Sequence, residues 1–235
     1  MAISVISCQK QSDRVLLIAT ASNMQDTMRG LIEEFEEASG IESELSVASS
    51  RKLATQIQNG APFNVFVSAD TICPYRLFKE QLTIDNLQIY AYGKLCLCSM
   101  ESNKDLLFSE SYLAGVERIA IANPEVAPYG RAAQEALRNV YPNYQDKLVR
   151  GESVGQAALF VKSGAAEVGI LSKSLKGSIE KEGGTCRDVN PQLYSPIAQA
   201  VVILKTSNET EAIAFRNFLL SDRGKEILNK FGYSE

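Results

Sequence analysis

Short apolar runs alternate with amphipathic stretches along the first third of the chain. Apolar runs at residues 15–21 and 65–67 predict buried strands, and residues 42–47 predict a strand between them. Residues 24–38 and the stretch from Ser49 to Gly60 place apolar side chains three and four positions apart, as one face of a helix does. This order of elements predicts an α/β fold with a parallel sheet and right-handed crossovers.

Polar side chains occupy the first positions of both predicted helices. Ser22 and Asn23 directly follow the first strand, and Ser49 and Ser50 follow the second. Ligands of such sheets bind outside the carboxyl ends of the strands, where helix N-termini offer unpaired backbone N–H groups and favour an anion. Each serine alone is also consistent with an ordinary N-cap. Two such helix starts on one edge of a sheet favour an anion site.

The second half of the chain repeats this pattern. Strands are predicted at residues 118–122, 148–149 and 167–171, and helices at 131–140 and 152–161. Tyr129 and Gly130 lie at the first turn of the first of these helices. Ser153 is placed to cap the second, which leaves the N–H groups of Val154 and Gly155 free to donate.

Two longer apolar runs, at residues 89–99 and 197–204, are suited to cross between two lobes. The expected division is a first lobe of residues 15–88 plus 201–235, a second lobe of residues 89–200, and an N-terminal arm of residues 1–14. Residues 172–192 are polar and are expected to lie mostly on the surface. Two lobes joined by two extended crossings form a hinged cleft that can close on a ligand.

Composition narrows the function classes. The chain has 235 residues, 22% of them charged, with a net charge of −4 and basic residues spread along its length, which argues against nucleic-acid binding. There are no histidines, which excludes histidine-based triads and histidine metal sites. No run reaches the roughly 18–20 apolar residues that span a membrane.

Two short motifs suggest enzymes. Gly151 to Gly155 matches the G-x-S-x-G elbow of α/β-hydrolases, whose mechanism needs a histidine that this chain lacks. Ser49 and Lys52 match S-x-x-K without the partner motifs of penicillin-binding enzymes. An enzyme acting through Ser153 or Ser50 remains an alternative, but the expectation is a protein without catalytic activity.

The sequence contains five cysteines: Cys8, Cys73, Cys96, Cys98 and Cys186. None forms a C-x-x-C pair, Cys96 and Cys98 share one face of a predicted strand, and buried free thiols are expected for most of the five. Residues 5–8 (VISC) resemble a lipoprotein signal box with Cys8 as the acylated residue, although no basic or fully apolar region precedes them. The alternatives are a lipid anchor at Cys8 and a chance cysteine in a frayed arm.

Five blocks together resemble the solute-binding proteins of bacterial molybdate ABC transporters. In order, they are GAPFNVFVSAD (Gly60–Asp70), YAYGKLCLCS (Tyr90–Ser99), ANPEVAPYGRAA (Ala122–Ala133), GESVGQA (Gly151–Ala157) and LSDRGKEILNKFGY (Leu220–Tyr233). The resemblance runs from about Val15 to the C-terminus. It implies a type II periplasmic-binding fold with a tetrahedral oxyanion held in the cleft.

The resemblance also implies a ligand set and a setting. The ligand positions of the family fall on Ser22, Asn23, Ser50, Tyr129 and Val154. The protein is then expected to capture molybdate or tungstate in the periplasm or at the cell surface and deliver it to a membrane permease, as a monomer without a cofactor. Another oxyanion such as sulfate is the alternative ligand. None of the five positions is acidic, which suits a fully deprotonated dianion.

Three positions depart from the family pattern. Arg51 stands where the family has a small residue, Asn64 where it has aspartate, and no tyrosine stands near Ser172, where one branch has a ligand tyrosine. A guanidinium beside the pocket favours a wider range of oxyanions, including sulfate or a sulfonate.

Overall fold

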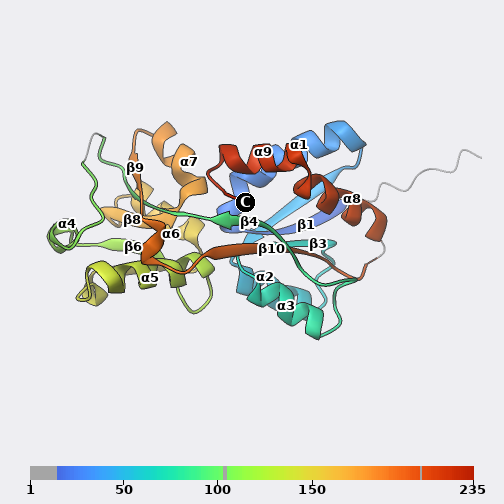
Figure 1. The fold of residues 1–235 in the computed structure, drawn as a ribbon, viewed down its shortest axis with the longest axis horizontal. Coiled ribbons are helices and arrows are strands. Elements are labelled where there is room, and N and C mark those ends of the chain that lie inside the picture. The colour runs from blue at the N-terminus through green and yellow to red at the C-terminus, as the bar shows by residue number, and fades with distance from the viewer. Residues whose placement is uncertain (1–14, 103–104, 207) are drawn as a thin grey trace, which may run out of the picture.

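The computed structural model describes residues 15–102, 105–206 and 208–235, which form two α/β lobes (Figure 1). Each lobe is built on one five-stranded sheet. The predicted arm and the lipidation candidate Cys8 lie outside the described residues. Within the described residues, none of the helices combines the length and apolar character that crossing a membrane requires.

The first lobe has the strand order β2-β1-β3-β10-β4. Its strands are β1 (Leu16–Ala21), β2 (Ser43–Ala48), β3 (Val65–Ser68), β4 (Gln88–Gly93) and β10 (Ile197–Ile203). Strands β1, β2 and β3 are parallel, as predicted, and β10 runs antiparallel between β3 and β4. Its helical segments are η1 (Ser22–Met24), α1 (Gln25–Ser39), α2 (Ser50–Gln58), α3 (Ile72–Lys79), α8 (Glu209–Leu220) and α9 (Asp222–Lys230).

The second lobe has the strand order β7-β6-β8-β5-β9. Its strands are β5 (Leu95–Ser99), β6 (Ile119–Ala122), β7 (Leu148–Gly151), β8 (Val168–Ser172) and β9 (Thr185–Asp188). Its helical segments are α4 (Glu110–Gly115), α5 (Pro128–Val140), η2 (Gln145–Lys147), α6 (Val154–Lys162), η3 (Lys173–Leu175), α7 (Lys176–Lys181) and η4 (Pro191–Leu193). Strand β6 pairs in parallel with β7 and β8, whereas β5 runs antiparallel to β8 and β9.

Helices cover both faces of the first sheet. Val65 and Val67 of β3 join a buried cluster with α1, α8 and α9, whereas Phe66 joins a second cluster with α2 and α3. This alternation follows from the period of two in a strand. Figure 1 shows α1, α8 and α9 on one side of the sheet and α2 and α3 on the other. Gly60, with φ of 85°, follows the end of α2 as the sequence predicts.

The first crossing differs from the single long strand expected, whereas the second is the single strand β10. The run at 89–99 breaks at Lys94, so that β4 pairs in the first sheet and β5 in the second. The returning strand β10 lies wholly in the first sheet. The change of sheet therefore falls at Lys94 and before Ile197, whereas the expected divisions stood at 88/89 and 200/201. Apolar composition does not reveal this, because both halves of the run at 89–99 are rich in apolar residues.

The prediction that residues 172–192 lie mostly on the surface agrees with the structure, although a minority of these residues are buried. This segment forms α7 and the edge strand β9, and Cys186 on β9 is buried. Cys186 forms a disulfide with Cys98, which corrects the expectation of free thiols for those two residues. Their Cα atoms are 4.1 Å apart, directly opposite one another in the β5–β9 register, but a separation of 88 residues gives no local signal of that contact. Cys73 and Cys96 are free and buried, as expected.

Candidate oxyanion site

Four helix starts lie at the carboxyl ends of strands, two in each lobe. In the first lobe, η1 follows β1 and α2 follows β2 with one residue between. In the second, α5 follows β6 through a short loop and α6 follows β7. All five residues predicted to bind the ligand are buried: Ser22, Asn23, Ser50, Tyr129 and Val154. The structure thus places all five at the edges where the sequence predicts an anion site.

The lobes meet directly at Ser22. Its hydroxyl oxygen accepts a hydrogen bond from the backbone N–H of Gly155 over 3.3 Å. A cleft of about 510 Å³ opens beside this contact, lined from the first lobe by Ser22, Ser49 and Lys52 among others. The second lobe contributes residues of α6, including Gly155. The first turns of η1 and α6 therefore face each other across the interface of the two lobes.

Ser50 is 1% exposed and begins α2. Its hydroxyl oxygen accepts from the backbone N–H of Ala69 over 3.0 Å, so its own proton remains able to donate. The N-cap residue Ser49 makes no side-chain cap hydrogen bond, and the first turn of α2 is therefore uncapped. The start of α2 offers a hydroxyl donor together with backbone N–H donors.

The side-chain amide of Asn23 is bonded within the protein and is not left for an anion. It donates to the side-chain oxygen of Gln199 over 2.9 Å and to the phenol oxygen of Tyr233 over 2.8 Å. These bonds use both amide hydrogens, so what Asn23 has left for an anion is the backbone N–H in the first turn of η1. The backbone carbonyl oxygen of Asn23 accepts a hydrogen bond from the hydroxyl of Ser174, in the second lobe, over 2.6 Å.

In the second lobe, Tyr129 and Val154 present backbone rather than side-chain donors. The buried Tyr129 phenol oxygen accepts from the Gln199 amide over 2.8 Å, which directs the ring toward the crossing strands. Burial raises the pKa of this phenol well above its usual value, so it stays neutral. Pro128 begins α5 and has no N–H, which makes the N–H of Tyr129 the first donor of that helix. Val154 holds the first position of α6.

Gln199 is the central residue that sequence reasoning missed. Its fully buried amide accepts from Asn23 and from Tyr90 and donates to Tyr129, so it joins both lobes from strand β10. Space around it is tight, since a Cβ on Gly93 would lie 2.4 Å from the Gln199 nitrogen. A signal was present in the sequence, because Gln199 is the one polar residue in the apolar run IAQAVVIL.

Carboxylates near the cleft are paired with cations. Asp26 and Glu152 line it, and they face Arg29 at 3.6 Å and Lys52 at 3.9 Å respectively. Asp70 binds Arg131 of the second lobe at 2.7 Å. These pairs leave the five predicted residues as a set of neutral donors.

The departures from the family pattern lie away from these donors. The Arg51 side chain is exposed and Lys52 lines the cleft instead, which removes the reason to expect a guanidinium in the pocket. Asn64 accepts from the Leu17 N–H at 2.7 Å and donates to Thr206, so its role is structural. Ser172 bonds the hydroxyl of Ser174 over 2.7 Å.

The G-x-S-x-G match has a structural explanation. Ser153 is the N-cap of α6, and its hydroxyl accepts from the Gln156 N–H over 3.2 Å. A Cβ on Gly151 would lie 2.8 Å from the Ala157 backbone nitrogen, so glycine allows the tight turn into the helix.

The family of bacterial extracellular solute-binding proteins matches residues 16–234. The chain belongs to this family. It is 36% identical over 222 residues to the molybdate-binding protein ModA of Rhodobacter capsulatus, covering 93% of this chain and 87% of that protein. It is 33% identical to ModA of Azotobacter vinelandii, covering 97% of this chain and 93% of that protein.

Solved structures agree on the fold. The periplasmic molybdate-binding protein of Azotobacter vinelandii superimposes with a TM-score of 0.85 at 31% identity, covering 94% of this chain and 99% of that one. The sulfate-binding protein SubI of Mycobacterium tuberculosis superimposes with a TM-score of 0.76 at 16% identity, covering 93% and 85%. The two-lobe type II fold predicted for this solute-binding protein is confirmed.

Proposed function

We propose that this solute-binding protein captures molybdate or tungstate between its lobes and delivers the anion to the permease of an ABC transporter. The observation that carries the proposal is the placement of four helix starts, two from each lobe, with buried hydroxyl and N–H donors at each sheet edge. The relatives named as molybdate-binding proteins, at 36% and 33% identity, support the choice of anion.

The chemistry of the donors suits a dianion that only accepts hydrogen bonds. In the proposal, Ser22 and Ser50 donate through their hydroxyls, and Asn23, Tyr129 and Val154 through their backbone N–H groups. Hydrogen bonds to a charged group contribute roughly 1.5–3 kcal/mol each, so about five to seven of them support micromolar to nanomolar affinity after the costs of association. Phosphate carries a proton at neutral pH and calls for an acceptor, which this set lacks.

Capture requires the lobes to open and close. In the structure, the lobes are bridged by Ser22 with Gly155, by Asn23 with Ser174, and by Asp70 with Arg131. An anion that accepts from both lobes adds bonds only when the lobes are closed, and it therefore favours the closed state.

Calorimetric titration with molybdate, tungstate, sulfate and phosphate tests the proposal. Binding of molybdate or tungstate with at least about tenfold preference over sulfate is expected, together with a rise in melting temperature by mass action. Tighter binding of sulfate would replace the proposed ligand with the alternative oxyanion. No heat and no thermal shift with any of the four anions would remove the proposal.

The proposed setting is the periplasm or the cell surface, with the protein acting as a monomeric binding protein and Cys8 as the candidate for lipid attachment. Expression of the chain and of Cys8→Ala behind one export signal, followed by fractionation, tests the anchor. Membrane association lost only in the variant supports it, whereas equal release of both proteins contradicts it.

A further inference from the structure

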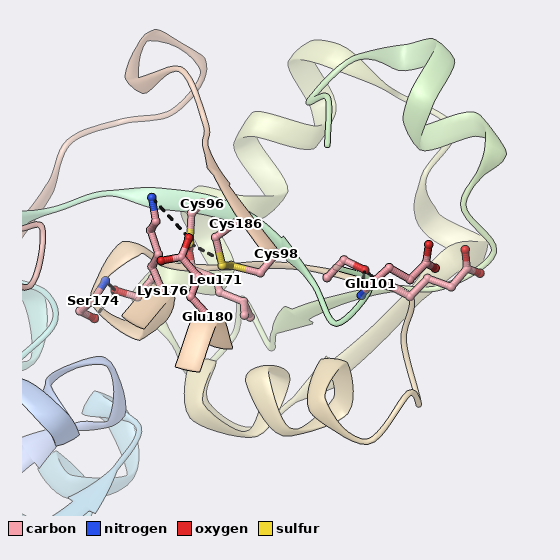
Figure 2. The surroundings of a disulfide bond; sticks show 11 residues. Cys96, Cys98, Glu101, Leu171, Ser174, Lys176, Glu180 and Cys186 are labelled. Carbon is pink, nitrogen blue, oxygen red and sulfur yellow. Dashed lines mark hydrogen bonds and ion pairs between the residues drawn. A yellow bond between two sulfur atoms is a disulfide. The ribbon is translucent and has the colours of Figure 1, made fainter. Parts of the chain in front are cut away.

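Three cysteine sulfurs gather in the second lobe, away from the oxyanion site (Figure 2). Cys96 and Cys98 alternate on β5 and so face the same side of the sheet, and Cys186 stands opposite Cys98 on β9. All three are buried, and their sulfurs lie within 4.8 Å of one another. Cys98 and Cys186 form the disulfide, while the free sulfur of Cys96 is 3.3 Å from that of Cys98.

A fourth sulfur, that of Met100, lies close to the chain that leads into Cys186. Met100 follows Cys98 by two residues, directly after β5 ends at Ser99. A Cβ built on Gly184, two residues before Cys186, would lie 3.1 Å from the Met100 sulfur. The thioether therefore lies across from the residues that lead into Cys186, and the absence of a side chain at Gly184 leaves room for it.

Charges beside the cluster are mixed. Lys173 pairs with Asp188 at 2.5 Å, and Lys176 pairs with Glu180 at 3.7 Å. Figure 2 shows the Lys176–Glu180 pair beside the sulfurs. A metal ion bound by several thiolates carries a net negative charge, which nearby ammonium groups offset.

We propose that Cys96, Cys98 and Cys186, supported by Met100, form a Cu(I) site when the disulfide is reduced. Thiolate and thioether sulfurs are the ligands that select Cu(I). A metal–sulfur bond of about 2.3 Å would place the sulfurs of a three-coordinate site about 4 Å apart. The three sulfurs already lie within 4.8 Å of one another, so separation of Cys98 from Cys186 on reduction and a small shift of Cys96 would give that spacing. Cys186 lies on β9, the edge strand of its sheet.

The disulfide and the metal exclude each other. A dithiol reductant supplies two electrons and two protons to the Cys98–Cys186 bond and becomes a disulfide itself, leaving two thiols. Each thiol that then ligates Cu(I) releases one proton to solvent. Reoxidation of Cys98 and Cys186 by a disulfide, which accepts the two electrons and becomes a dithiol, would expel the ion.

The test is a Cu(I) competition titration against a chromogenic chelator under anaerobic conditions, on the whole protein before and after reduction by a phosphine that is then removed. One Cu(I) per chain is expected in the reduced protein and none at this cluster in the oxidised protein. Cys96→Ser, which leaves the disulfide pair intact, should lower the Cu(I) affinity of the reduced protein at least about hundredfold, more than loss of an outer-shell partner does. Met100→Leu should lower it about tenfold.

Cys73→Ser is the matched control, because Cys73 is a buried free thiol of the other lobe and should leave Cu(I) binding unchanged. Equal affinity in the reduced wild type and Cys96→Ser would overturn the proposal, as would loss of cooperative unfolding in the reduced protein. Molybdate titrations of the same samples keep this result separate from the proposed function, since the cluster lies in the core of one lobe.

Discussion

The two lobes contribute different kinds of donors to the candidate site. In the first lobe, Ser22 and Ser50 bring buried hydroxyls, and Ser49 leaves the start of α2 uncapped. In the second lobe, the hydroxyl of Ser153 caps α6, and the proposed donors Tyr129 and Val154 act only through their backbone N–H groups. Truncating a side chain can therefore remove a donor from the first lobe, whereas in the second lobe the backbone itself must be altered.

The lobes also differ in how they are joined. Gln199 belongs to the first sheet but holds Asn23 of the first lobe and Tyr129 of the second through one amide. Asn23 and Tyr129 therefore belong both to this contact between the lobes and to the proposed set of ligand donors. Perturbing this link should affect both lobes, whereas perturbing one donor should affect binding alone.

The largest effect is expected for Gln199→Leu, which removes one buried link between the lobes. Three buried polar groups lose a partner, so the free energy of unfolding should fall by about 3 kcal/mol or more. Chemical denaturation measures this change. Gln192→Leu, at an exposed position on η4, is the control and should change little. Equal stability of the two variants would show that the link does not hold the lobes.

Val154→Pro tests the backbone donor of the second lobe. Proline is tolerated at the first position of a helix, and Ser153 has φ of −147° and ψ of 164°, which suit a residue before proline. Only the N–H is lost, and anion affinity should fall by about 2 kcal/mol, or roughly thirtyfold. Calorimetry with molybdate gives the affinity. Val154→Ala keeps the N–H and should bind almost normally, so equal weakening in both variants would contradict the backbone role.

Ser50→Ala and Ser22→Ala test the hydroxyl donors of the first lobe. Each should weaken oxyanion binding at least about tenfold, or about 1.4 kcal/mol. Ser46→Ala is the control, because Ser46 is exposed on β2 and no ligand role is proposed for it. If affinity is unchanged in both Ser22→Ala and Ser50→Ala, the site has been misplaced.

The smallest effect concerns pH. Burial raises the pKa of Tyr233 to about 12, so the folded protein keeps this phenol protonated where the unfolded chain ionises. Stability from this group is fully present below pH ~10 and is lost as pH rises toward 12, which amounts to about 1 kcal/mol by pH ~11. Tyr233→Phe should reduce this alkaline slope and the exposed control Tyr75→Phe should not. Denaturation curves from pH 8 to pH 11 measure the slope.

The fold was largely readable from the sequence because local pattern determines it. Apolar runs and helical spacing placed the parallel strands and the helix starts, and each start was marked by a turn or a hydroxyl. The exact points where the chain changes sheet were not readable. Lys94 divides an apolar run whose first half pairs in one sheet and whose second half pairs in the other.

Long-range partners account for the remaining differences. The Asn23 side-chain amide donates to Gln199 and Tyr233, which lie 176 and 210 residues away in the sequence. Cys98 forms a disulfide with Cys186, 88 residues away. Patterns within one segment carry no information on such pairs. The lone Gln199 in an apolar strand and the paired cysteine face of β5 were the available signals that a buried partner must exist.

The order of strands has a consequence for synthesis on the ribosome. Strand β10 lies between β3 and β4 but is translated after every strand of the second sheet. The second lobe can therefore fold from one continuous segment. The first lobe stays incomplete, with β4 unpaired, until roughly the last forty residues emerge. A chain truncated just before Ile197 would hold a finished second lobe beside an incomplete first lobe.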